Sequence, residues 1–300
     1  SAEAKVTTGI LPPAAIELEL DGSDTAVVTF NKQMERESAE NPANYRVTGA
    51  DVTVISASLN QNGKSVTLTL SGLSALDMAQ LTVENVKDLS GKNTVSGSDT
   101  FTLSLLYHYY KLDEEAGQAA GDEAGHASGT KTGGVTSVDG KDGKAAGFGG
   151  SDYIEVDSDA LYQQDTFTVS AWINWDGSSG VNAIVGNDIS GDAGSRGIIF
   201  YVGSDGELRC NSNVAGMGGS EKVTANEWHH VAFVKQTGSA QLYLDGKQIG
   251  NEALQYGVET RVGFRIGGSH KGGGGLSYPS QGAIDEVRTF TTSLTEAEVG

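Results

Sequence analysis

The sequence predicts an all-β protein built from two β-sandwich domains. Glycine makes up 42 of the 300 residues, about twice the usual share of roughly 7%, which favours many tight turns. Apolar and polar residues alternate in short segments, such as 65–70 and 167–174, and this period of two is typical of half-buried strands. Turn-forming pairs such as Asn62-Gly63 and Asp245-Gly246 separate the segments.

A shift in composition divides the chain near Leu105 and Leu106. Residues 1–104 contain 7 glycines, residues 105–300 contain 35, and all three tryptophans lie in the second part. We therefore expect a linker or tail over residues 1–13, a first domain over 14–104 and a second over 105–300.

Charge and cysteine content exclude several classes of protein. Twenty basic and 39 acidic residues give a net charge of −19, which disfavours nucleic acid and anionic membranes because both bind clustered lysine and arginine. No apolar run approaches the ~18 residues of a transmembrane helix, so no membrane insertion is expected. The single cysteine, Cys210, excludes an intrachain disulfide framework and is expected to be a buried small hydrophobe.

The first domain is expected to be a small β-sandwich of alternating strands. Three of its segments are VTFNKQM at 28–34, NPANY at 41–45 and VKDLSG at 86–91. With these, residues 14–104 resemble the immunoglobulin-like (Ig-like) domains of bacterial surface proteins. That resemblance implies a spacer role.

The second domain carries a longer, ordered set of segments. They are HYYKLDE at 108–114, FGGSDYIEV at 148–156, FTVSAW at 167–172, WHHVA at 228–232, LYLDG at 242–246, IGG at 266–268, GAIDEVR at 282–288 and LTEAEV at 294–299. In this order they resemble the laminin-G-like, concanavalin-A-like jelly roll family. The resemblance implies two stacked antiparallel sheets, with glycans bound on the concave face or its rim loops and a calcium ion at a sheet edge.

Carried over from that family, the structural calcium would be held by Asp113, a carbonyl of Gly149 or Gly150, and Asp285. Simple alternation places Asp285 on the same face as Ala283 and Val287, where a lone carboxylate needs a partner. The alternative is that Asp285 pairs with a basic residue or caps a turn and that Asp113 is solvated.

Aromatic side chains with polar neighbours are the candidates for sugar binding, because aromatic faces stack on sugar rings and polar groups bind the hydroxyls. Trp172 lies on the opposite face from the apolar residues of its strand, so it either faces an open surface or packs on another layer. The candidate ligand-binding residues are Trp172, Asn174, Tyr201, Arg209, Asn211, His270 and Tyr278.

Other motifs favour structural roles. Adjacent His229 and His230 point to opposite faces of a strand and cannot easily hold one metal ion. The oxygen-rich loop 187–192 lacks the spacing of a calcium hand and is expected to be a rim loop. A glycosidase pattern of Glu-x-Asp-x-x-Glu begins at Glu155 but meets Ala160 at its sixth position, so we expect no catalytic residues.

We therefore expect a non-catalytic, carbohydrate-binding or adhesion fragment of a larger bacterial protein, secreted or associated with the cell wall. Its expected partners are a glycan or polysaccharide and other domains of the same parent protein. Strongly anionic polysaccharides are disfavoured unless Arg209, Arg265 or Lys271 cluster locally. Three alternatives remain: a protein-binding module, a purely structural accessory to a catalytic domain, and a jelly-roll glycosidase or lyase.

Overall fold

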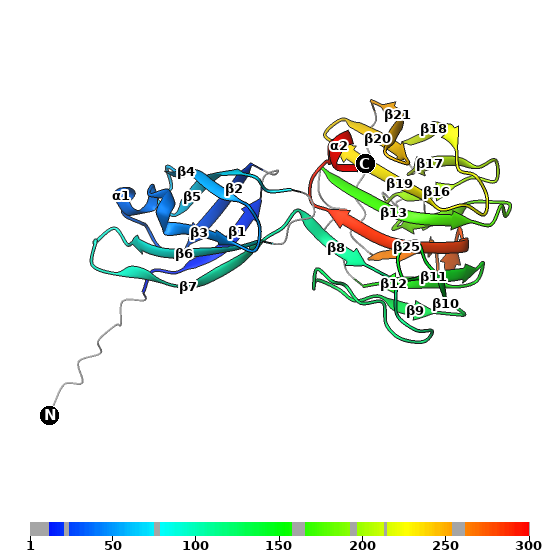
Figure 1. Ribbon diagram of the computed structural model, residues 1–300, viewed down its shortest axis with the longest axis horizontal. Coiled ribbons are helices and arrows are strands. Elements are labelled where there is room, and N and C mark those ends of the chain that lie inside the picture. The colour runs from blue at the N-terminus through cyan, green and yellow to red at the C-terminus, as the bar shows by residue number, and fades with distance from the viewer. Residues whose placement is uncertain are drawn as a thin grey trace. The chain divides into compact units, whose positions relative to one another are not determined.

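The chain divides into two compact β units, with the boundary between Leu105 and Leu106 (Figure 1). The computed structural model describes residues 12–20, 24–74, 79–157, 166–192, 197–212, 215–253 and 262–299. Residues 1–11 of the expected tail, and Ala160, lie outside these ranges.

The first unit is a sandwich of two antiparallel sheets. One sheet has the order β1-β2-β5-β4 and the other the order β3-β6-β7. A short helix α1 (Arg36–Ala39) and a 3-10 turn (Pro42–Asn44) follow β2. The strands are β1 (Ala15–Leu20), β2 (Thr25–Phe30), β3 (Tyr45–Thr48), β4 (Thr53–Leu59), β5 (Ser65–Ser71), β6 (Ala79–Lys87) and β7 (Thr94–Leu103).

Alternation along the strands builds the core of this unit. Val66, Leu68 and Leu70 of β5 are buried, as are Val28 and Phe30 of β2, which pairs with β5. Residues of period two point to one face of a sheet, so these side chains share the face that packs on the second sheet. The predicted half-buried strand at 65–70 is confirmed.

The second unit consists of two large sheets. The eight-stranded sheet has the order β10-β11-β25-β13-β19-β20-β21, with β8 also paired to β25. Its strands are β8 (Leu106–Tyr110), β10 (Thr136–Asp139), β11 (Lys144–Gly149), β13 (Phe167–Trp175), β19 (His229–Gln236), β20 (Ser239–Leu244), β21 (Lys247–Glu252) and β25 (Gln281–Phe290).

The seven-stranded sheet has the order β18-β17-β16-β14-β22-β12-β9. Its strands are β9 (Thr130–Thr132), β12 (Tyr153–Val156), β14 (Asn182–Gly186), β16 (Ile199–Val202), β17 (Glu207–Asn211), β18 (Gly216–Lys222) and β22 (Phe264–Ile266). A small third sheet joins β15 (Ile189–Ser190), β23 (Ser269–Lys271) and β24 (Leu276–Ser277), and helix α2 spans Glu296–Val299. Within the described ranges, the helices are too short to cross a membrane.

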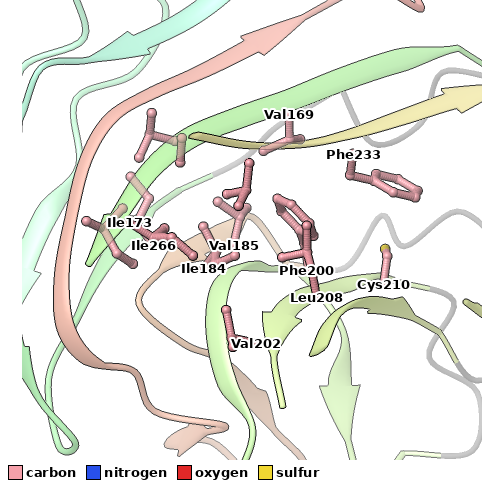
Figure 2. Close-up of a cluster of buried hydrophobic side chains, with 14 of the residues drawn as sticks. Val169, Ile173, Ile184, Val185, Phe200, Val202, Leu208, Cys210, Phe233 and Ile266 are labelled. Carbon is pink, nitrogen blue, oxygen red and sulfur yellow. The ribbon is translucent and has the colours of Figure 1, made fainter. Parts of the chain in front are cut away.

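The core of the second unit lies between the two large sheets (Figure 2). Val169 and Ile173 of β13 and Phe233 of β19 enter it from the eight-stranded sheet, while Phe200 of β16 enters it from the other. Cys210 of β17 is fully buried in this core, which confirms its expected role as a small hydrophobe.

A bulge in β25 overturns the simple alternation expected there. Ile284 and Val287 both point into the core, although they are three residues apart. The pairing with β13 shifts between Ser170 and Trp172, and Glu286 adopts a positive φ of 53°, so one extra residue is accommodated. Asp285 therefore does not share a face with Val287; it pairs with Trp172 and points to the outer side of the sheet.

Candidate functional site

A pocket of about 210 Å³ opens on the outer face of the seven-stranded sheet. Its position follows from the strand order, because β16 and β17 supply one side of it and the small third sheet adjoins the other. The lining residues are Val181, Asp188, Ile199, Tyr201, Asn211, Ser212 and Tyr278.

Strand β16 supplies the floor of the pocket. Phe200 and Val202 point inward to the main core, so Ile199 and Tyr201 point outward. They form a separate apolar cluster with Ala183 of β14, and Val181 and Tyr278 pack against it. The four residues of β16 are all buried because one face is covered by the core and the other by this outer cluster.

Hydroxyl and amide groups surround this apolar floor. The Asn211 side-chain amide donates to the Tyr201 hydroxyl at 2.8 Å, and the Ser190 hydroxyl donates to the Tyr278 hydroxyl at 3.2 Å. Burial raises the pKa of Tyr201 above its usual value, so its hydroxyl keeps its proton at neutral pH. The pocket thus combines aromatic surface with the uncharged hydrogen-bonding groups of Tyr201, Asn211 and Tyr278, beside the carboxyl group of Asp188.

Tyr278 occupies a strained backbone conformation at the rim of the pocket. Its φ is +53°, a region that costs a non-glycine residue of order 1–3 kcal/mol, and it precedes Pro279. The backbone N–H of Ala183 donates to the Tyr278 carbonyl at 3.2 Å, and the side chain is half-buried on the outer cluster. Strain of this kind concentrates at functional positions.

The small third sheet lies on the outer face because Gly186 has no side chain. A Cβ on Gly186 would lie 2.7 Å from the Cβ of Ser269, so only glycine allows β23 to approach β14 this closely. The Ser269 hydroxyl and the His270 N–H both donate to the Asp188 carbonyl, which anchors Asp188 at the pocket wall.

The structure brings together three of the expected ligand-binding residues, Tyr201, Asn211 and Tyr278, in one pocket. Arg209 pairs directly with Tyr201 across β16 and β17, so it lies beside them. Sequence reasoning missed the pocket residues Val181, Asp188, Ile199 and Ser212. Asp188 belongs to the oxygen-rich loop 187–192, which was expected to be a rim loop. That expectation was the one feature of the sequence that pointed to Asp188.

Trp172 and Asn174 lie elsewhere, on the outer face of the eight-stranded sheet. Trp172 pairs with His230 and Asp285 on neighbouring strands, and the Lys141 ammonium lies 4.2 Å from its ring centroid. Packed sheets are separated by ~10 Å, and their outer faces point in opposite directions. The expected candidates therefore cannot form one site.

His270 is also outside the pocket lining. It is buried, its Nε2 atom lies 3.2 Å from the Gly263 carbonyl and 3.5 Å from a Glu155 carboxylate oxygen, and Glu155 binds the Arg265 guanidinium at 2.7 Å. Arg265 in turn lies 4.1 Å from the ring of Tyr153. These contacts join β12, β22 and β23. The charge of Arg265 is therefore paired with the Glu155 carboxylate.

The expected calcium ligands separate into two groups. Asp285 accepts the N–H groups of Lys141 and Asp142 at 2.8 and 3.1 Å, and Asp113 accepts that of Lys144 at 2.6 Å, so both carboxylates hold the turn between β10 and β11. The Oδ1 atom of Asp285 is buried without a hydrogen-bond partner, which suits a cation.

Gly149 and Gly150 are not near this turn. Gly149 ends β11, five residues beyond Lys144, which is about 16 Å along a strand. The Gly149 N–H donates instead to the nearby Asp152. Asp113 and Asp285 thus both bind the backbone of this turn, whereas the two glycines lie away from it.

His229 and His230 diverge as adjacent strand residues must. The Nδ1 atom of His229 lies 2.8 Å from the Asp245 carboxylate, while the His230 ring stacks obliquely on Trp172 at 5.4 Å. Burial lowers the pKa of His230 to about 4, so it is neutral at pH 7. In the described part of the chain, no group of three or more histidine, cysteine or acidic residues is arranged to hold a metal.

These features define a two-domain β protein whose second domain carries a solvent-facing pocket on one sheet. Residues 148–300, half of the chain, match the concanavalin A-like lectin/glucanases superfamily, and residues 8–104 match the bacterial Ig-like domain family. The chain belongs to the concanavalin A-like lectin/glucanases superfamily, and its second domain has the expected jelly roll fold. No curated protein matches the sequence.

Solved structures share this fold. Domain 4 of AbnA, an extracellular GH43 arabinanase of Geobacillus stearothermophilus in complex with arabinotriose, is 23% identical with a TM-score of 0.52, and the match covers 65% of this chain and 96% of that one. A Trypanosoma rangeli sialidase mutant displaying trans-sialidase activity is 13% identical with a TM-score of 0.50, over 92% of this chain and 47% of that one. At these identities the likeness concerns the fold.

Proposed function

We propose that the second domain is a non-catalytic carbohydrate-binding module and that its ligand occupies the pocket on the seven-stranded sheet. The observation that carries the proposal is the strained, half-buried Tyr278 facing a pocket with the hydrogen-bonded pair Tyr201 and Asn211. Aromatic surface beside oriented hydroxyl and amide groups suits a sugar ring, which has apolar faces and a rim of hydroxyls.

The family and one structural neighbour support this proposal. The superfamily includes lectins by its description, and the arabinanase domain named above was solved with arabinotriose. Neither assigns a ligand to this chain, so the chemistry of its own pocket is the argument.

Binding without cleavage is part of the proposal. Glycosidases generally use two carboxylates about 5–9.5 Å apart across the scissile bond. Among the described residues that line the pocket, Asp188 is the one carboxylate. Glu155, where the incomplete glycosidase pattern begins, is bound to Arg265.

We also propose that the Ig-like domain acts as a spacer in a secreted or wall-associated bacterial protein, and that calcium bound by Asp113 and Asp285 supports the jelly roll. A cation there would neutralise the carboxylates that bracket the turn between β10 and β11. Asp113 and Asp285 would bind the calcium ion, and the backbone N–H groups of the turn would keep the two carboxylates in place.

A glycan array with the full chain, followed by calorimetry on the best ligand, tests the binding proposal. Tyr278→Ala and Asn211→Ala should each weaken binding about tenfold or more, because a lost aromatic or hydrogen-bond contact is worth about 1–2 kcal/mol. Trp172→Ala, on the other sheet, is the control and should bind normally.

Each alternative gives its own result in this experiment. Loss of binding in Trp172→Ala alone would move the site to the eight-stranded sheet. Absence of any glycan ligand would favour a structural or protein-binding module, and cleavage of a bound oligosaccharide would make the protein an enzyme.

A further inference from the structure

The pocket is lined by neutral or acidic groups. In the described part of its lining, Asp188 supplies the one carboxyl group and no lysine, arginine or histidine occurs. Arg209 is a cationic side chain beside the pocket, because it pairs across strands with the floor residue Tyr201. The contacts of its guanidinium therefore bear on whether the site attracts an anion.

The Arg209 guanidinium is already bound by two carboxylates. Its Nη1 and Nη2 atoms donate to the two oxygens of Asp205 at 2.9 and 2.7 Å, and Nη2 also donates to Glu207 at 2.7 Å. The fork to Asp205 is bidentate, which is the strongest geometry for this pair. Together the three side chains carry a net charge of −1.

The same contacts hold the guanidinium at the hairpin turn. A Cβ on Gly203 would overlap Nη1 of Arg209, so the guanidinium rests on Gly203, next to Asp205 in the turn between β16 and β17. Asn211, the polar pocket residue on β17, lies two positions along the strand in the other direction. The positive charge is thus drawn away from the pocket.

The ion pair between Arg209 and Asp205 is kept at neutral pH. The hydrogen bonds from Arg209 hold the pKa of Asp205 well below its usual value, so the carboxylate stays ionised. Because Asp205 and Glu207 bind the Arg209 guanidinium, it does not extend toward an anionic ligand in the pocket. Such a ligand would enter a chain of net charge −19, and like charges across an interface are strongly unfavourable.

We propose that the pocket selects a neutral saccharide and rejects sugars that carry carboxylate or sulfate groups, and that Asp205 and Glu207 set this specificity by holding Arg209. The inference rests on the proposed function. The pocket volume of about 210 Å³ is below the ~300–1,000 Å³ of drug-sized sites, which suits the end or a single residue of a glycan chain.

Matched pairs of oligosaccharides test the selectivity by calorimetry. Galactotriose is compared with trigalacturonate and mannotriose with trimannuronate, because each pair differs chiefly in the charge at C6. The wild-type chain should bind the better neutral sugar at least about tenfold more tightly than its acidic counterpart.

The double variant Asp205→Asn/Glu207→Gln frees the Arg209 guanidinium without changing side-chain size. It should bind the acidic sugar about three- to tenfold more tightly than wild type, with the gain lost in high salt, and bind the neutral sugar as before. The control variant Asp139→Asn/Glu221→Gln removes two charges at exposed ion pairs away from the pocket and should gain nothing.

The outcomes separate the two proposals. Binding of the acidic sugar by wild type as tightly as the neutral one, or no gain in the double variant, overturns the selectivity while glycan binding stands. An equal gain in the control variant assigns the effect to overall charge and overturns the role of Asp205 and Glu207. Failure of every sugar, these four and those of the glycan array alike, overturns both proposals together.

Discussion

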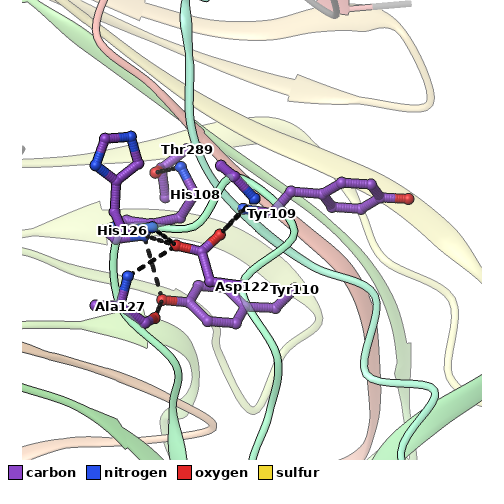
Figure 3. Close-up of polar contacts among 8 residues, drawn as sticks. His108, Tyr109, Tyr110, Asp122, His126, Ala127 and Thr289 are labelled. Atoms are coloured by element: carbon purple, nitrogen blue, oxygen red, sulfur yellow. Dashed lines mark hydrogen bonds and ion pairs between the residues drawn. The ribbon is translucent and has the colours of Figure 1, made fainter. Parts of the chain in front are cut away.

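Replacement of Asp122 is expected to destabilise the second unit without affecting the first. Its carboxylate accepts hydrogen bonds from the His108 ring at 2.7 Å and from the N–H groups of Tyr109, Ala124, His126 and Ala127 at 2.9–3.0 Å (Figure 3). It therefore ties the segment after β8 back onto that strand. The carboxylate is 1% exposed, so water cannot readily replace it.

The size of the effect follows from the groups left without an acceptor. Asp122→Ala removes the carboxylate that accepts hydrogen bonds from the buried His108 ring and from the N–H groups of Tyr109 and Ala127. Each lost hydrogen bond should cost about 1–3 kcal/mol. We expect a loss of about 3–9 kcal/mol in the free energy of unfolding. Asp122→Asn keeps one acceptor oxygen and loses the charge, which should cost about 2–3 kcal/mol.

Urea unfolding followed by tryptophan fluorescence measures this directly, because all three tryptophans lie in the second unit. Asp139→Asn removes an exposed ion pair with Lys144 and is the control, with an unchanged midpoint. Wild-type stability in both Asp122 variants would show that this carboxylate does not hold the segment after β8 in place.

The pH dependence of the same difference is a second readout. Burial by itself raises the pKa of Asp122, but the hydrogen bonds from His108 and from the Ala127 and Tyr109 backbone outweigh it and hold the pKa well below its usual range. A depressed carboxyl pKa stabilises the fold above the unfolded value of about 3.9, and this stabilisation is lost as the pH falls further. The difference between wild type and Asp122→Asn should shrink below about pH 4; growth of the difference there would contradict the assignment.

Three further changes have defined outcomes. At Tyr278, whose φ is positive, the glycine variant should be about 1 kcal/mol more stable than the alanine variant, and denaturant melts that rank alanine higher would argue against the strain. Gly267→Ala should lower the free energy of unfolding by roughly 2–4 kcal/mol, because the new Cβ would overlap the Phe148 ring. Gly273→Ala, with a similar φ and open space around it, should lower it by about 1 kcal/mol. Equal losses of stability in the two variants would show that there is no clash with Phe148. Added calcium should raise the melting temperature of wild type but not of Asp285→Asn, and a chelator should reverse the rise; an equal response in both would remove Asp285 from the proposed site.

Local patterning was sufficient to find most strands. Val66, Leu68 and Leu70 were expected on one face of a strand and are buried together, because side-chain direction in a strand depends only on position parity. The same rule failed at Asp285. A bulge changes parity, and the one in β25 depends on its pairing with β13, more than a hundred residues away.

The candidate site was found only in part for a similar reason. Tyr201, Asn211 and Tyr278 meet in the pocket, whereas Trp172 belongs to the other sheet. The order of strands in a sheet depends on contacts between distant parts of the chain. Residues with suitable chemistry could therefore be recognised in the sequence, but they could not be assigned to one site.

The amino-acid sequence alone was sufficient to predict two successive β domains, an acidic chain, and a set of aromatic and polar residues as candidates for a ligand site. These properties follow from composition, period-two alternation and turn chemistry, all of which act over a few residues. Tertiary structure alone decided that Tyr278 closes a pocket over β16, that Arg209 is held by Asp205 and Glu207, and that Trp172 faces away. Those outcomes depend on strand order and on which sheet covers which face, and such contacts join residues that local preferences do not connect.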